Sequence, residues 1–164
     1  CALPISDEKW VPTFPNARYL FGRTEWEHWS DENHPQKRGE DIIGDSVKPI
    51  VDAGLADLVD SDHKITDEIW LEPTPGHTPG HVSVRISSRG EDALITGDFM
   101  HHPCQMARPD WRSAADYDGE WAEKTRNELL QQYADQPVLV IGTHFATPTA
   151  GHILRDGNVY RFKV

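Results

Sequence analysis

The 164-residue sequence lacks any apolar run of the roughly 20 residues that a membrane-spanning helix needs, and its mean hydropathy is −0.62. Basic residues are also scarce, because 16 lysines and arginines stand against 27 aspartates and glutamates, for a net charge of −11. Nucleic acids and anionic membrane surfaces are bound through clustered basic residues. The sequence therefore argues against a nucleic-acid partner and against membrane association.

Cysteine is nearly absent, with Cys1 and Cys104 as the only two. These two could form one disulfide, but they make no disulfide framework, and free thiols in a reducing compartment are the simpler interpretation. The sequence also shows no signal peptide with a basic start and an apolar middle. We therefore expect a cytoplasmic protein.

The first third of the chain predicts two helices and two short strands. Residues 17–21 predict a buried strand, and Thr24 with Glu27 has the spacing of a capping box that opens a helix. Apolar residues at near-helical spacing predict a second helix over 40–51, and 55–59 predicts another short strand.

The remaining two thirds alternate predicted strands with one long helix, as one α/β domain does. The expected elements are strands over 82–86, 93–96 and 138–141, a helix over 118–133, and a closing hairpin over 153–164. Residues 99–117 form a long irregular stretch, and loops of this length inside a domain are often functional.

The stretch Pro73–His81 reads PTPGHTPGH. Its three prolines and two glycines exclude a helix, because proline lacks an amide donor and clashes with the preceding turn. We therefore predict a rigid turn that presents His77 just beyond the hydrophobic run 69–71. A metal site needs such rigid presentation, since a loose ligand must be ordered at an entropic cost.

Three residues share one local pattern: His77, Asp98 and His144 each follow a hydrophobic strand and have a glycine close by. Taken singly, each is more simply a turn residue. If the strands are neighbours, however, the three side chains emerge at one sheet edge and converge. Imidazole and carboxylate ligands suit zinc, and also iron or manganese, so the pattern favours a metal site.

The motifs TPGHTPGH, LITGD and IGTH, in this order, resemble the C-terminal half of the metallo-beta-lactamase fold hydrolases. That superfamily includes lactonases, glyoxalase II thioesterases and organophosphate hydrolases. The resemblance implies an α/β fold that is half of a four-layer αββα sandwich. It runs from about Trp10 to the end, so we expect 1–9 to be a linker or non-native segment and 10–164 to be the C-terminal portion of such a domain. The family's first metal motif, His-x-His-x-Asp-His, does not occur in this sequence.

The resemblance implies a centre of two divalent metal ions, zinc first, with iron or manganese as alternatives. His77 would bind one ion, His144 the other, and the catalytic Asp98 would bridge both. A hydroxide held between the ions would attack an ester, lactone or phosphoester. Local likeness in GDFMHH and THFATPTAGH favours the lactonase and organophosphate-hydrolase branch.

The resemblance also implies roles for neighbouring residues. His81 is expected to hydrogen-bond to backbone and orient the ligands rather than bind metal. The residues after Asp98 and His144 are expected to line a pocket for a small-molecule substrate: Phe99, Met100, His101, His102 and Phe145. A sheet face left uncovered would make the chain prone to association, for example as a homodimer.

Two other functions stay open at this stage. The three residues could form the two-histidine, one-carboxylate triad of a mononuclear iron oxygenase, which usually sits on a many-stranded barrel. The domain could also bind a metal or a partner without turnover. Because the absent motif would leave each cation with two protein ligands, where catalytic zinc normally has three, we expect the chain alone to be a poor enzyme.

Overall fold

The computed structural model describes residues 5–6, 9–31 and 43–164, which fall into two compact units divided after Asp60. Each unit is described by itself. Among the described residues, no helix combines the length and the apolar character that crossing a bilayer demands.

The first unit is built on two parallel strands, β3 (Tyr19–Gly22) and β4 (Ala56–Val59). The connection between them carries the helix α1 (Arg23–Ser30), a π-helical turn (Ile43–Val47) and the helix α2 (Lys48–Asp52). Two-residue strands β1 (Ile5–Ser6) and β2 (Lys9–Trp10) pair antiparallel. These elements confirm the predicted strand–helix–helix–strand order.

Two details of the prediction are wrong in this unit. Strand β3, which was expected to be buried, contains no buried residue, and Leu20 is 41% exposed. The expected capping box does not form, because the N-cap of α1 is Gly22, two residues before Thr24, and it makes no side-chain cap bond. Trp26 and Trp29 help to line a pocket of about 210 Å³ within this unit.

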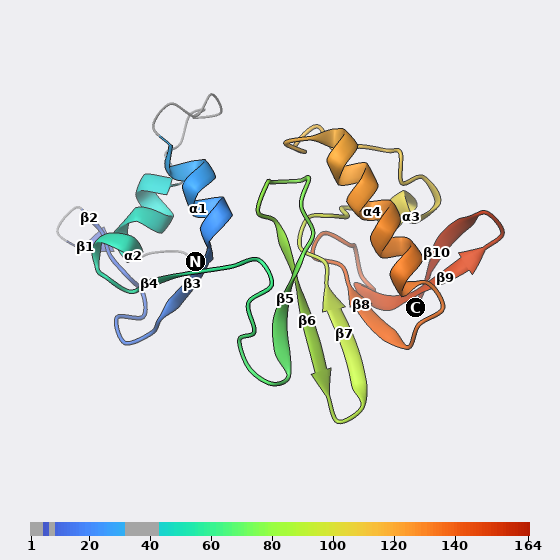
Figure 1. Ribbon diagram of the computed structural model, residues 1–164, viewed down its shortest axis with the longest axis horizontal. Coiled ribbons are helices and arrows are strands. Elements are labelled where there is room, and N and C mark those ends of the chain that lie inside the picture. Colours follow the sequence, from blue (N-terminus) through green and yellow to red (C-terminus); the bar gives the residue numbers. More distant parts are fainter. Residues whose placement is uncertain (1–4, 7–8, 32–42) are drawn as a thin grey trace. The chain divides into compact units, whose positions relative to one another are not determined.

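The second unit is an open six-stranded sheet in the order β10-β9-β8-β7-β6-β5. Only β7 and β8 run parallel, and every other neighbouring pair is antiparallel. Figure 1 shows this sheet, whose strands are β5 (Ile69–Pro73), β6 (Val82–Ser88), β7 (Glu91–Ile95), β8 (Val138–Ile141), β9 (Ala150–Asp156) and β10 (Val159–Lys163).

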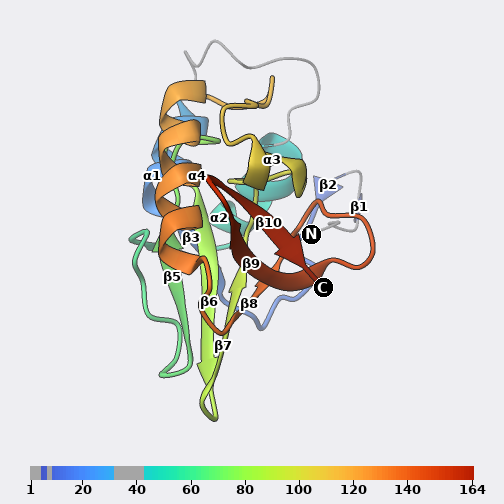
Figure 2. The ribbon, with the colours of Figure 1, turned by 90° about the vertical axis from the view of Figure 1, so that its right-hand side faces the viewer.

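The long helix α4 (Gly119–Tyr133) connects β7 to β8 and lies along one face of this sheet (Figure 2). Its N-cap is Asp118, whose side chain accepts hydrogen bonds from two amides of the first turn. The helix buries Leu129, Leu130 and Tyr133 against sheet residues such as Leu94 and Val140. Burial of this size stabilises by roughly 1.5–3 kcal/mol per large apolar side chain. This contact is the core of the unit.

The opposite face of the sheet is also apolar. On β8, Val138 and Val140 are buried while the alternating Leu139 is 38% exposed. The strand pairing places further apolar residues on the same face of the sheet as Leu139, and none of them is buried. They are Ile69, Leu71, Val84, Ile86, Ala93, Ile95 and Ile141. A sheet that is apolar on both faces is typical of an inner layer that other elements cover on both sides.

The second unit follows the predicted order with two differences. The irregular stretch contains one short helix, α3 (Cys104–Ala107), which the sequence did not indicate. An amphipathic helix over 118–133 would be expected to bury Trp121 with its other large apolar residues, but Trp121 is 39% exposed, and Ala122 and Arg126 are buried.

Candidate metal centre

The turn that carries His77 is bound to the start of α4. Gly76 has φ +129, and a Cβ there would lie 2.3 Å from the backbone nitrogen of Ala122, so only glycine allows this approach. The Thr125 hydroxyl donates to the carbonyl of Pro75 at 2.6 Å. The backbone amide of Tyr117 donates to the carbonyl of His77 at 2.9 Å. The start of α4 and the residue Tyr117 before it thus hold the turn at three successive residues, Pro75, Gly76 and His77.

Asp98 and His144 follow the ends of two neighbouring parallel strands. Ile95 of β7 pairs with Ile141 of β8, and each ligand candidate lies three residues further on. Because parallel strands end at the same edge, both side chains arrive together. The Thr143 amide donates to Thr96 Oγ1 at 3.1 Å and joins the two loops.

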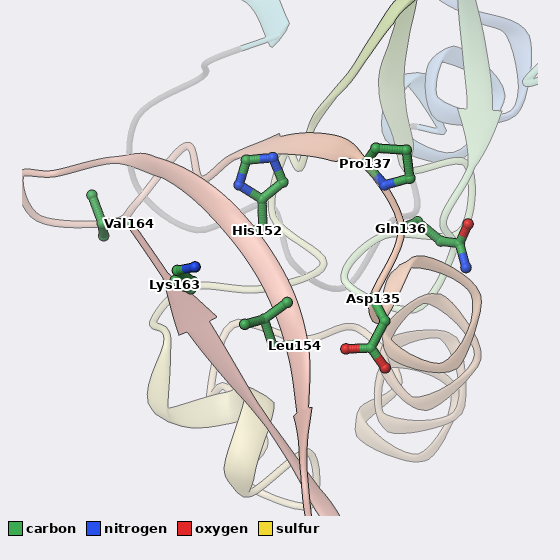
Figure 3. Close-up of a pocket in the computed structure, with 7 residues that line it drawn as sticks. All are labelled: Asp135, Gln136, Pro137, His152, Leu154, Lys163 and Val164. Carbon is green, nitrogen blue, oxygen red and sulfur yellow. The ribbon is translucent and has the colours of Figure 1, made fainter.

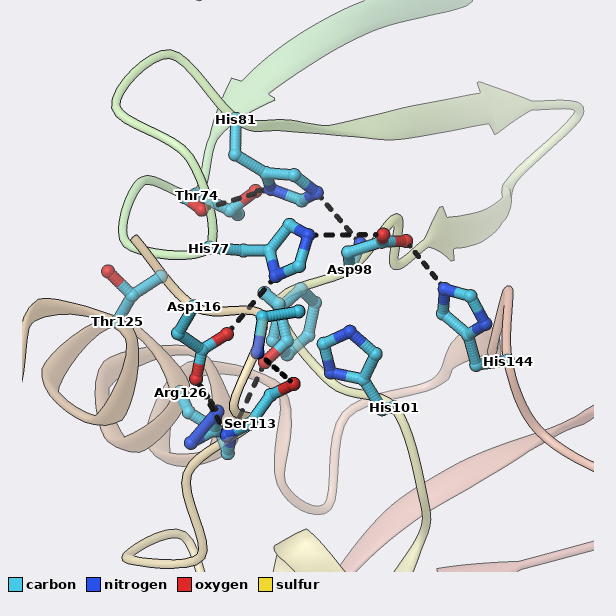
Figure 4. A network of polar contacts seen from close by, with 12 residues as sticks. Thr74, His77, His81, Asp98, His101, Ser113, Asp116, Thr125, Arg126 and His144 are labelled. Atoms are coloured by element: carbon cyan, nitrogen blue, oxygen red, sulfur yellow. Dashed lines mark hydrogen bonds and ion pairs between the residues drawn. The ribbon is translucent and has the colours of Figure 1, made fainter. Parts of the chain in front are cut away.

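The Asp98 carboxylate lies between the two histidines, as Figure 4 shows. Its Oδ2 is 3.3 Å from His77 Nε2, and its Oδ1 is 3.0 Å from His144 Nε2. The structure therefore brings together the three side chains that the sequence predicted to converge. Each carboxylate oxygen faces a different imidazole, which is the arrangement that a bridging carboxylate needs.

His101 adds a further nitrogen donor that the sequence assigned to a pocket wall. One ligand atom from each of His77, Asp98 and His101 lies within 4.8 Å of the others. The His101 ring stacks on His144 with centroids 5.0 Å apart, and its buried Nδ1 has no hydrogen-bond partner among the described residues. Burial lowers the pKa of His101, and the nearby charge of His77 lowers that pKa further.

His81 lies behind Asp98 in a buried hydrogen-bond chain. The Asp98 amide donates to His81 Nε2 at 2.8 Å, so that nitrogen carries no proton. The His81 Nδ1–H then faces Thr74, with the carbonyl at 3.0 Å and the hydroxyl at 2.7 Å. The chain continues through Ser83, which donates to the carbonyl of Thr96 at 2.8 Å. The contact of His81 with the Asp98 backbone is of the kind predicted, and its orienting role stays a prediction.

The remaining predicted site residues divide by burial. Phe99, Met100 and Phe145 belong to the buried core cluster beneath the ligand loops. His102 is exposed, and its Nδ1 accepts from the Cys104 amide at 3.1 Å. Their contribution to a substrate pocket stays a prediction.

Sequence reasoning missed two buried charged residues at this centre. Asp116 Oδ1 lies 3.1 Å from His77 Nδ1, and Arg126 on α4 lies beside the same carboxylate. Asp116 stands in an irregular loop, where no pattern marks it. Arg126 could have been noticed as a charged residue between the buried positions of an otherwise apolar helix face.

The donor set fits a divalent cation. Imidazole nitrogens and a carboxylate are the ligands that zinc, iron and manganese take in proteins. The Asp98 side chain is 33% exposed, so the centre is open to solvent. Nδ1 of His101 has no hydrogen-bond partner within the described part of the chain, and its nitrogen is a further candidate metal ligand. A separate pocket of about 280 Å³ at β9 and β10 is lined by none of the predicted site residues (Figure 3).

Comparison with known proteins gives one family and several solved structures. The sequence pattern of the family described as the metallo-beta-lactamase superfamily matches residues 1–144. A search of curated proteins finds no match. Hydrolase AbOPH of the beta lactamase superfamily has a TM-score of 0.79 and 25% identity, over 91% of this chain and 55% of its own.

Two further structures show the same fold at lower identity. AidC, a dizinc quorum-quenching lactonase solved with a product, has a TM-score of 0.76 and 22% identity, over 93% of this chain and 58% of its own. A probable metal-dependent hydrolase from Staphylococcus aureus has a TM-score of 0.69 and 20% identity, over 92% of this chain and 53% of its own. The chain thus spans little more than half the length of these three structures.

Proposed function

The chain belongs to the metallo-beta-lactamase superfamily, and from that premise we propose that its site serves the metal-dependent hydrolysis of an ester, lactone or phosphoester bond. The observation that carries this proposal is the Asp98 carboxylate, which turns one oxygen toward His77 and the other toward His144. The fold alone would not support a reaction, because one fold hosts many functions.

In this proposal the residues of the chain have distinct tasks. His77 and His144 would each hold a divalent cation through the ring nitrogen that faces Asp98, and the Asp98 carboxylate would serve both. Divalent cations held there would activate water and stabilise the negative charge that develops on the attacked group. His81 keeps the Asp98 backbone in place, and the Asp98 side chain is partly exposed to solvent. Zinc is the first candidate metal, with iron and manganese as alternatives.

The substrate class is proposed from chemistry and from the relatives together. A water nucleophile at a solvent-open site suits small electrophilic carbonyl and phosphoryl centres. AidC is named as a lactonase, and another similar structure is an N-acyl homoserine lactone hydrolase solved with its product. We therefore place lactones first among the substrates, with aryl esters and phosphotriesters as the other classes.

The metal part of the proposal is tested by equilibrium dialysis of the purified chain against zinc or manganese, followed by elemental analysis. Bound metal should be lost in Asp98→Ala and strongly reduced in His77→Ala and His144→Ala. His63→Ala is the control, because His63 lies outside the site. Absence of bound metal, or binding that ignores all three substitutions, would refute the proposal.

The catalytic part is tested by assaying the metal-loaded chain with an acyl homoserine lactone, an aryl acetate and a phosphotriester. Because the sequence carries no His-x-His-x-Asp-His motif, we expect turnover more than tenfold below that of a full-length dizinc relative. Residual turnover should disappear on chelation and in Asp98→Ala. Bound metal without any metal-dependent turnover of the three substrates would favour the non-catalytic alternative.

The oxygenase alternative finds no support in the fold. Its triad usually sits on a many-stranded barrel, whereas the six strands of the second unit form an open sheet that ends at β5 and β10.

A further inference from the structure

His77 has both ring nitrogens opposite a carboxylate, but the two contacts differ. Nδ1 forms a hydrogen bond with Asp116 Oδ1 at 3.1 Å. Nε2 lies 3.3 Å from Asp98 Oδ2, at ion-pair distance. Asp116 is 39 residues further along the chain, in the loop between α3 and α4, and its side chain is 1% exposed.

The hydrogen bond to Asp116 decides where the His77 proton resides. A carboxylate oxygen accepts in such a hydrogen bond, so the bond places the proton on Nδ1. In a neutral imidazole with Nδ1 protonated, the lone pair is on Nε2. That lone pair faces Asp98. Asp116 thus selects both the tautomer and the ring orientation that a metal ligand at this position requires.

Asp116 is itself held by buried groups. Its Oδ2 accepts from the Ser113 amide at 2.9 Å and lies 3.8 Å from the terminal nitrogen of Arg126, whose side chain is 0% exposed. A hydrogen-bond donor and an opposite charge at this distance offset the cost of burying a carboxylate. Burial lowers the pKa of the Arg126 guanidinium, and the Asp116 charge opposes that change.

Arg126 also fixes the loop that begins at the other ligand. Its Nε donates to the carbonyl of Phe99 at 3.2 Å, next to Asp98, and its Nη1 donates to the carbonyl of Pro109 at 2.9 Å. One buried guanidinium therefore supports the backbone beside Asp98 and the carboxylate behind His77 (Figure 4).

We propose that Asp116 is a positioning residue that fixes His77 as an Nε2 metal ligand, with Arg126 as its buried counter-ion. The inference rests on the proposed metal-dependent function, because Asp116 acts through His77. Carboxylate partners of this kind set the orientation and basicity of a metal-binding histidine, and their removal typically costs about 10–100-fold in metal affinity.

The first test uses the wild-type chain without metal. Two-bond nitrogen–proton correlation spectra at pH 8 report the tautomer of each neutral histidine. His77 should carry its proton on Nδ1, although free imidazole side chains favour Nε2. A His77 with its proton on Nε2 would overturn the proposal. This measurement needs neither bound metal nor activity, so it separates failure of this inference from failure of the proposed function.

The second test compares Asp116→Asn and Asp116→Ala with Asp110→Ala. The control, Asp110, lies in the same loop but is half exposed and pairs with Arg108. Zinc affinity, measured by competition with a chelating dye, should fall about 10–100-fold in Asp116→Ala and less in Asp116→Asn, whose carbonyl still accepts from Nδ1. Asp110→Ala should match the wild type.

A purely structural Asp116 predicts a different outcome. In that case Asp116→Ala would lower the melting temperature while the folded protein kept the wild-type His77 tautomer and zinc affinity. That result would also overturn the proposal. If Asp116→Ala does not fold, the wild-type tautomer and Asp116→Asn still decide it.

Discussion

Replacing Gly76 by alanine should destabilise the chain far more than an ordinary glycine substitution. The φ of +129 lies in a region that alanine reaches only at a cost of about 1–3 kcal/mol. The new Cβ would also lie 2.3 Å from the nitrogen and 2.4 Å from the Cα of Ala122. Overpacking of this kind costs about 1–3 kcal/mol, and the upper end applies because backbone atoms cannot rotate away. We expect a total loss of about 4–6 kcal/mol, a large part of the 5–15 kcal/mol that domains have.

The matched control is Gly157→Ala in the β9–β10 turn. Gly157 also has a positive φ, +61, but nothing lies within 4 Å of a Cβ there, so only the backbone cost of about 1–2 kcal/mol applies. With a urea slope of about 2 kcal/mol per molar, the midpoint should fall by about 2–3 M for Gly76→Ala and by about 0.5–1 M for Gly157→Ala. Equal shifts in the two variants would refute the close packing of the turn on α4.

Three further outcomes are expected. Ser83→Ala, which breaks the buried hydrogen-bond chain, should lower the free energy of unfolding by about 1–3 kcal/mol, and an unchanged thermal midpoint would contradict that chain. Folding lowers the pKa of His101, so its contribution to stability is complete above the unfolded pKa of about 6.5 and is lost as the pH falls toward the folded pKa. In metal-free protein, His101→Gln should therefore reduce the loss of stability between about pH 7 and pH 5, as measured by denaturant titrations. Leu139→Lys should reduce self-association, measured by sedimentation velocity, because Leu139 lies on the apolar face of the sheet opposite α4. Val159→Lys on β10 is the control and should reduce it less, since Leu139 and Val159 are similarly exposed, at 38% and 39%.

Local signals were sufficient for the elements that carry the ligands. The hydrophobic run 138–141 is β8 to the residue, and Asp118 before an amphipathic stretch marks the start of α4. Convergence of Asp98 and His144 was predicted only on the condition that their strands are neighbours, and the parallel pairing of β7 with β8 meets that condition. His77 arrives from β5, which β6 separates from β7, so its turn and not strand adjacency brings it to the site.

What the sequence did not reveal depends on contacts between distant residues. Thr24 has the spacing of an N-cap, but β3 runs directly into α1 at Gly22, which leaves Thr24 inside the first turn. Asp116 reaches His77 across 39 residues, from a loop with no periodic pattern. The His101 ring packs between His77 and His144, and the sequence gives no sign that distinguishes His101 from its neighbour His102.

The hydrogen bonds around the ligand turn should also determine how often the loops of the site open. The amides of Tyr117 and Asp118 donate to the carbonyls of His77 and Gly76, and the Asp98 amide donates to His81. Such linked bonds break together, so these amides should exchange with deuterium at one common, slow rate. Because loops that open only together open rarely, they are already ordered when a cation arrives. The speed of metal capture would then follow how fast the ion sheds its own water, and not how fast the protein rearranges.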